Sequence, residues 1–70
     1  MEKYITVFIN DEPFNFNDFM SLKDLLLYLN FNLNVIIVEY NKEIVTSSNY
    51  ENIFLKTNDF IEVITIVGGG

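Results

Sequence analysis

In one stretch of the 70-residue chain the apolar residues recur with the period of an α-helix, and in the segments on both sides of it they do not. In MSLKDLLLYLN (20–30) the apolar residues recur at the spacing of one helix face: Leu22, Leu25, Leu26 and Leu29. Ser21 and Asp24 resemble a capping box at the start of this helix, and Asn30 suits its end because asparagine tolerates the left-handed conformation. One short helix with one apolar face has to pack against a second layer, which the flanking segments must supply.

The flanking segments alternate with the two-residue period of β-strands. Five strands are expected, at residues 4–9, 14–16, 35–40, 43–45 and 60–67. Turns are expected at residues 10–13, 41–42 and 57–59, and residues 46–54 are polar and irregular. The order β-β-α-β-β-β predicts an α+β fold in which one helix packs on one face of a mixed sheet.

Two glutamates indicate which side chains of the sheet face the helix. Glu39 and Glu62 should remain in contact with solvent, because a carboxylate is costly to bury. Alternation along each strand then turns Val38, Ile61 and Val63 toward the helix.

The same alternation places an apolar group on the opposite face of the sheet. Phe8, Ile64 and Ile66 should share this face, which a single helix leaves uncovered. An apolar patch on a small acidic protein often marks a surface that binds a partner. The alternatives are that loop 46–56 folds over the patch, or that the register is shifted by one residue.

The composition excludes several kinds of function. Four Lys, no Arg and ten acidic residues give a net charge of −6, so we expect no nucleic-acid partner. The chain has no His and no Cys, so it cannot form a Ser–His or Cys–His nucleophile, and no metal site is expected. No run of 18 apolar residues occurs and MEKYITV lacks a signal-peptide layout, so we expect a soluble, intracellular protein without a membrane partner. An enzyme acting alone is not expected.

All three glycines of the chain stand together at its end, as Gly68, Gly69 and Gly70. The expected turns use asparagine instead, so three consecutive glycines are a specific feature. We expect a folded domain at 1–67 and a flexible glycine tail at 68–70. Without side chains, such a tail can enter a narrow channel and deliver its terminal carboxylate to another protein's active site. The alternative is an inert terminus.

Four segments resemble the ThiS family of sulfur carriers, which has the ubiquitin-like β-grasp fold: VFIND (7–11), SLKDLLLYL (21–29), VEYNKEIV (38–45) and NDFIEVITIVGGG (58–70). The last segment is the most specific. Two departures stand out. Asn58 replaces the family's usual glycine, and the Pro-Arg that commonly follows Ile44 and Val45 is absent, although the later aromatic residue is kept as Tyr50.

The resemblance implies a carrier mechanism in the thiamine pathway. A ThiF-type, E1-like adenylyltransferase would use ATP and Mg²⁺ to adenylate the carboxylate of Gly70, and the chain itself would hold no permanent cofactor. A sulfur donor would then give a thiocarboxylate, which passes its sulfur to a ThiG-type thiazole synthase. In this scheme Gly68 and Gly69 thread the tail into the partner, while Phe8, Ile64 and Ile66 dock it.

Three other functions remain open at this level. They are the MoaD-like small subunit of molybdopterin synthase, a ubiquitin-like protein modifier, and an interaction module with an inert tail. The compartment is expected to be the cytoplasm, or the plastid stroma if the gene is organelle-encoded. Ten Asn, nine Ile, no Ala and no Arg are the bias of an A/T-rich genome.

Overall fold

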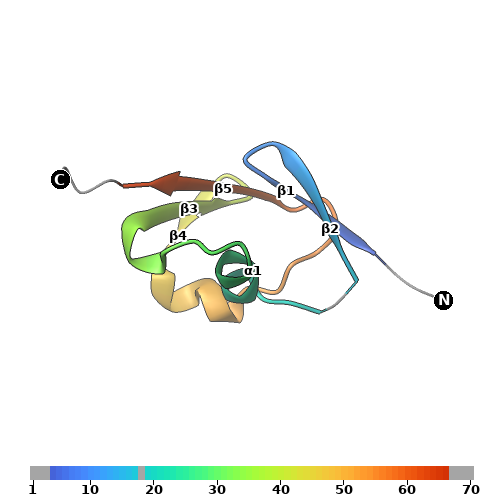
Figure 1. Cartoon of the computed structure of the whole chain (residues 1–70), viewed down its shortest axis with the longest axis horizontal. Helices are drawn as coiled ribbons and strands as arrows, with labels where there is room; N and C mark the ends of the chain where they lie inside the picture. Colours follow the sequence, from blue (N-terminus) through green and yellow to red (C-terminus); the bar gives the residue numbers. More distant parts are fainter. Residues whose placement is uncertain (1–3, 18, 67–70) are drawn as a thin grey trace.

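The computed structural model describes residues 4–17 and 19–66, which form a five-stranded sheet with one α-helix against one face (Figure 1). The elements are β1 (Ile5–Ile9), β2 (Glu12–Phe16), α1 (Leu22–Tyr28), the 3₁₀ helix η1 (Leu33–Val35), β3 (Ile36–Tyr40), β4 (Glu43–Val45), the 3₁₀ helix η2 (Ser47–Asn52) and β5 (Phe60–Thr65). The strand order is β2-β1-β5-β3-β4, with β1 and β5 parallel and the other pairs antiparallel. The predicted element order and mixed sheet are confirmed.

Both hairpins close through two residues in the left-handed region. Asn10 and Asp11 have φ of 51° and 70°, and Asn41 and Lys42 have φ of 51° and 74°. Two positive φ values in succession are typical of the type I′ turn, whose twist matches that of the strands. The expected four-residue turn at 10–13 is therefore wrong, because β2 already begins at Glu12.

The ends of α1 are where the sequence predicts them. Ser21 Oγ accepts a hydrogen bond from the Asp24 N–H at 3.1 Å, and the Asp24 carboxylate accepts one from the Ser21 N–H at 3.3 Å. Asn30 has φ of 67°, and the next residue, Phe31, donates its N–H to the Leu26 carbonyl at 3.0 Å. These contacts are a capping box and a Schellman-type end, which satisfy backbone groups that the helix leaves unpaired.

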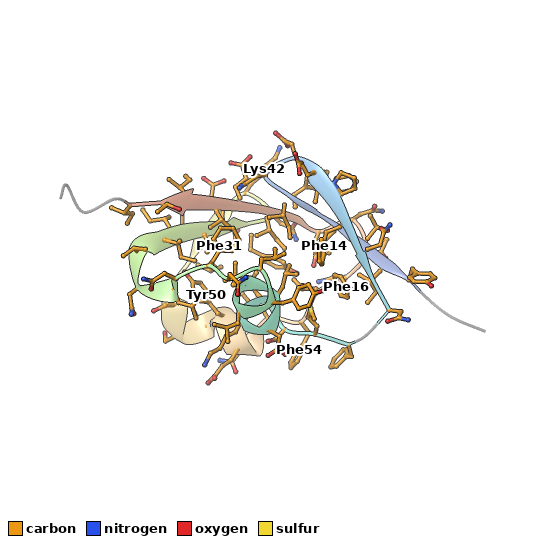
Figure 2. All side chains as sticks on the ribbon, in the orientation of Figure 1. Phe14, Phe16, Phe31, Lys42, Tyr50 and Phe54 are labelled. Carbon is orange, nitrogen blue, oxygen red and sulfur yellow. The ribbon has the colours of Figure 1, made fainter. Side chains whose placement is uncertain are left out.

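The segment expected to be irregular at 46–54 contains η2 and carries one buried aromatic residue. Tyr50 is 2% exposed and belongs to the core. The Leu22 N–H donates to the Ile53 carbonyl at 2.7 Å, and the Leu55 N–H donates to the Met20 carbonyl at 3.1 Å. The segment thus packs beside the start of α1, on the helix side of the sheet (Figure 2). It does not fold over the opposite face, so that alternative is wrong.

The core lies between the sheet, α1 and η2. Its buried members come from every layer: Val7, Leu22, Leu25, Leu26, Ile36, Val38, Tyr50, Leu55, Ile61 and Val63. The predicted inward direction of Val38, Ile61 and Val63 is confirmed, and the register is not shifted. Among the described residues, no helix is long and apolar enough to cross a membrane.

Candidate functional site

The face of the sheet turned away from α1 is the candidate site, and we call it the outer face. Residues paired across neighbouring strands point to the same side, so the pairing of the strands defines its members. Its apolar and acidic members on β1, β3, β4 and β5, and directly after β5, are Phe8, Ile37, Glu39, Ile44, Phe60, Glu62, Ile64 and Ile66. Nothing in the described part of the chain packs over the two isoleucines Ile64 and Ile66, which are 52% and 49% exposed.

Aliphatic side chains gather near the end of β5. Ile64 stands directly opposite Ile37 of β3, and both are exposed. Ile66 follows on the same side, and its N–H donates to the Val35 carbonyl at 2.6 Å. Backbone pairing with β3 therefore holds these side chains in place while leaving them open to solvent, as a binding surface requires.

An aromatic pair occupies the beginning of β5. The rings of Phe8 and Phe60 are stacked, with centroids 4.9 Å apart and an angle of 15° between their planes. Phe8 is partly buried by this contact. Sequence reasoning placed Phe8 on this face but missed Phe60. The alternation along this strand would have placed Phe60 on the outer face, because Phe60 points to the same side as Glu62 and Ile64.

Two carboxylates lie between the aliphatic and aromatic groups. Glu39 and Glu62 are directly opposite each other in the register of β3 and β5. They border a hollow of about 450 Å³ that Asp11, Lys42 and Phe60 also line. Adjacent like charges on neighbouring strands are unfavourable, and Lys42, which lines the same hollow, supplies a positive charge beside them.

A buried carboxylate anchors the start of β5. Asp59 is 4% exposed and accepts hydrogen bonds from the Tyr40 hydroxyl at 2.7 Å, the Lys56 N–H at 2.8 Å and the Asn41 side-chain amide at 3.2 Å. The turn before it holds Asn58 at φ 73°, a left-handed conformation that asparagine tolerates. Both carboxylate oxygens of Asp59 accept hydrogen bonds from residues of the same domain, so Asp59 positions the start of β5.

The groups around Asp59 have altered acid–base properties. Burial and the hydrogen bond to Asp59 raise the pKa of Tyr40. The Lys56 Nζ donates to the Tyr40 hydroxyl at 3.1 Å, and this hydrogen bond raises the pKa of Lys56, with a further contribution from the Asp59 charge. Tyr40 and Lys56 are both protonated at neutral pH, because a raised pKa moves each of them further above that range.

The expected reactive end lies outside the described residues. Gly68, Gly69 and Gly70, and the domain boundary at 67/68, remain predictions. Within residues 4–17 and 19–66, no cluster of three or more carboxylates could hold a metal ion.

A model of the ThiS family matches residues 3–70. The protein named ycf40 in Trieres chinensis is 43% identical over 65 residues, which cover 93% of this chain and 89% of that protein. The sulfur carrier protein ThiS of Bacillus subtilis is 38% identical over 50 residues, which cover 71% of this chain and 76% of that one. The similarity therefore spans most of both molecules.

A longer relative and a solved structure complete the comparison. The thiazole synthase of Magnetococcus marinus is 36% identical over 64 residues, which cover 91% of this chain but only 20% of that protein. The crystal structure of the thiamine biosynthesis protein ThiS from Geobacter metallireducens matches with a TM-score of 0.80 at 22% identity, over 94% of this chain and 100% of that one. The predicted ubiquitin-like β-grasp fold is thus confirmed. With a family match that runs from residue 3 to residue 70, the chain belongs to the ThiS family.

Proposed function

We propose that this chain is a sulfur carrier of thiamine biosynthesis whose terminal Gly70 is adenylated and then converted to a thiocarboxylate. The observation that carries the proposal is the family match over residues 3–70, which includes the glycine end. The similarity to the sulfur carrier ThiS of Bacillus subtilis supports the same role.

The chemistry explains why a carrier needs an activating partner. A free carboxylate is a poor electrophile, so a ThiF-type adenylyltransferase joins it to the AMP part of ATP, with Mg²⁺, and pyrophosphate leaves. The terminal sulfur of a persulfide donor then attacks the acyl carbon and AMP leaves. A thiol cleaves the resulting acyl disulfide, which gives the Gly70 thiocarboxylate. ATP and Mg²⁺ are substrates of the partner, and the carrier itself holds no permanent cofactor.

The thiazole synthase is the proposed acceptor of the sulfur. In Magnetococcus marinus and Paramagnetospirillum magneticum, the proteins named thiazole synthase contain a region similar to this chain in about a fifth of their length. A carrier and its acceptor joined in one chain have a high effective concentration, which fits two proteins that must meet repeatedly.

The outer face gives the carrier a docking surface separate from its reactive end. Phe8, Ile64 and Ile66 would bind the adenylyltransferase through apolar contact, and Gly68 and Gly69 would let the tail pass into its active site. Glu39 and Glu62 would pair with basic residues of the partner. Such complementarity raises the rate of encounter more than it raises affinity.

Intact-mass spectrometry tests the adenylation step. The purified chain is incubated with a ThiF-type adenylyltransferase, Mg²⁺ and ATP, and the expected product is heavier by one adenylyl group. The matched control lacks Gly70; it should form no adduct and should keep the circular dichroism spectrum and melting temperature of the full chain. An absent adduct on the full chain would count against this function and against the molybdopterin-synthase alternative together.

The same measurement separates the sulfur carrier from a protein modifier. Protein isolated from sulfur-replete cells should contain a form in which one oxygen is replaced by sulfur at Gly70. Conjugates of the chain on lysine residues of other proteins would instead support the ubiquitin-like modifier. The family assignment favours the sulfur carrier.

The compartment is part of the proposal. The name ycf40, which denotes plastid-encoded genes of algae, is carried by relatives in Trieres chinensis and Porphyra purpurea and favours the plastid stroma over the cytoplasm. Expression of a fluorescent fusion would be uninformative for an organelle-encoded gene, so immunodetection in isolated plastids is the direct test.

A further inference from the structure

One side of β5 is left open toward its C-terminal end. β3 pairs with β5 from Ile61 to Thr65, whereas β1 lies beside Phe60 and Ile61 only. In Figure 1 the arrow of β5 runs well past the β1–β2 hairpin. No other strand in residues 4–17 and 19–66 continues where β1 stops, so the second half of a central strand has a free edge.

The hydrogen bonds show which backbone groups face this edge. The Ile66 N–H donates to the Val35 carbonyl at 2.6 Å, so the even-numbered residues of this strand direct their backbone groups toward β3. The Asn10 N–H donates to the Ile61 carbonyl at 2.9 Å, so the odd-numbered residues face the side of β1. By this alternation the N–H and the carbonyl of Thr65 both point toward the open edge.

The side chain of Asn10 closes the pairing between β1 and β5. The backbone turns away at this residue, where φ is 51°, and its Oδ1 accepts the Val63 N–H at 2.8 Å in place of a further strand residue. Beyond this point the Val63 carbonyl, the Thr65 N–H and the Thr65 carbonyl have no partner among the described residues. They form an acceptor, a donor and an acceptor in the order that a paired strand would satisfy.

We propose that an extended segment of the thiazole synthase pairs with this edge of β5 and extends the sheet. This inference rests on the proposed function. Proteins commonly protect free edges with lysine, proline or a bulge, and residues 62–66 carry none of these. Main-chain pairing at such an edge supplies affinity with little dependence on side chains.

Pairing at this edge would also orient the reactive end of the carrier. β5 leads directly to residues 67–70, so a strand fixed along Val63 and Thr65 sets the direction in which Gly70 is presented. The cost of ordering the end in the acceptor falls when the strand before it is already held.

Charge favours a basic partner over a second copy of this chain. Glu62 lies beside the edge, and the chain has a net charge of −6, so two copies would repel each other. A partner strand flanked by lysine or arginine would gain from the same charges.

Replacement of Thr65 by proline tests the edge directly. Thr65→Pro removes the outward N–H without removing a bond to β3, because the amide of this residue faces the other way. Thr65→Val is the matched control, since it loses the hydroxyl and keeps the N–H. Isothermal titration calorimetry with purified thiazole synthase should show affinity lower by roughly tenfold for Thr65→Pro and unchanged for Thr65→Val, as expected for one or two lost hydrogen bonds.

Hydrogen exchange of the unmodified chain provides a second measurement that does not depend on any variant. The Thr65 amide should exchange rapidly in the free protein and slowly in the complex. If thiazole synthase binds while Thr65 exchange stays fast, or if Thr65→Pro binds as Thr65→Val does, the edge inference is overturned and the proposed function stands. Absence of binding by the unmodified chain overturns both. Protection of Thr65 that grows with the concentration of the chain alone identifies a second copy and overturns the partner strand.

Discussion

The two faces of one sheet use similar side chains for different purposes. Ile61 and Ile64 belong to the same strand, yet Ile61 is 1% exposed and Ile64 is 52% exposed. Ile61 is covered by α1 and its neighbours, whereas nothing in the described part of the chain covers Ile64 on the outer face. Apolar composition alone therefore does not separate residues that stabilise the fold from residues that are available to a partner; the direction of the side chain does.

The largest effect should come from truncating the two isoleucines separately. Ile61→Ala removes buried contacts and leaves a cavity, so it should lower the free energy of unfolding by about 2–5 kcal/mol. A chain of this size has roughly 4–10 kcal/mol in total, so this change approaches global unfolding. Ile64→Ala should cost less than about 1 kcal/mol, because half of the side chain is already in water. Urea denaturation measures both, and equal losses would contradict the contrast between the faces.

The next largest effect concerns the anchor of β5. Asp59→Ala leaves three donors without an acceptor, namely the Tyr40 hydroxyl, the Asn41 amide and the Lys56 N–H, and should cost about 2–3 kcal/mol. Asp59→Asn keeps the shape and one acceptor oxygen, so it should cost less. Thermal melts of the two variants provide the comparison. A smaller loss for alanine than for asparagine would show that the carboxylate does not anchor the strand.

Helix α1 covers the face of the sheet opposite the outer face, and its stability depends on the cap at its first turn. Ser21→Ala removes the acceptor of the Asp24 N–H and should cost about 1 kcal/mol. Ser21→Asp keeps a capping oxygen and is the matched control. Chemical denaturation should place the aspartate variant above the alanine variant; the reverse order would mean that the cap contributes nothing.

The smallest effect is a loss of stability in alkali. Burial raises the pKa of Tyr50, and burial with the Asp59 hydrogen bond raises the pKa of Tyr40. Both phenols are therefore favoured in their neutral form by the fold. Their contribution is fully present below the unfolded pKa of about 10 and is lost as pH rises through the higher folded values.

Melting temperatures measured from pH 8 upward should thus be flat at first and then decline above pH about 10. The pKa of the Lys56 ammonium is also raised, so this group loses its stabilising charge as the pH rises and adds to the same decline. Tyr40→Phe should melt lower at neutral pH and decline less steeply in alkali. A melting temperature that rises in this range would contradict the assignment.

Much of the fold follows from the sequence because its local signals agree. The helical stripe, the Ser21–Asp24 cap and the end at Asn30 all indicate the same helix, and the structure has it at Leu22–Tyr28. The glutamates of β3 and β5 fixed the inward direction of Val38 and Ile61 correctly.

Other features depend on contacts between distant residues. The sequence of the first hairpin does not show whether NDEP is a turn of four residues or of two; the pairing of Ile9 with Glu12 decides this. The burial of Tyr50 arises from packing beside α1, which no local period reveals. The open edge of β5 depends on where the parallel strand β1 stops. The roles of Gly68–Gly70 lie outside the described residues and stay predictions.

If the outer face docks the partner, a substitution there should slow adenylation of the chain without unfolding it. Ile64→Asp and Leu27→Asp add the same charge at sites of similar exposure, on the outer face and on α1 respectively. The decisive measurement is the rate at which a ThiF-type adenylyltransferase forms the AMP adduct with each variant, with melting curves recorded alongside. We expect at least a tenfold slower rate for Ile64→Asp than for Leu27→Asp, while both remain folded. Equal rates in two folded variants would contradict the claim that the outer face presents the carrier to its partner.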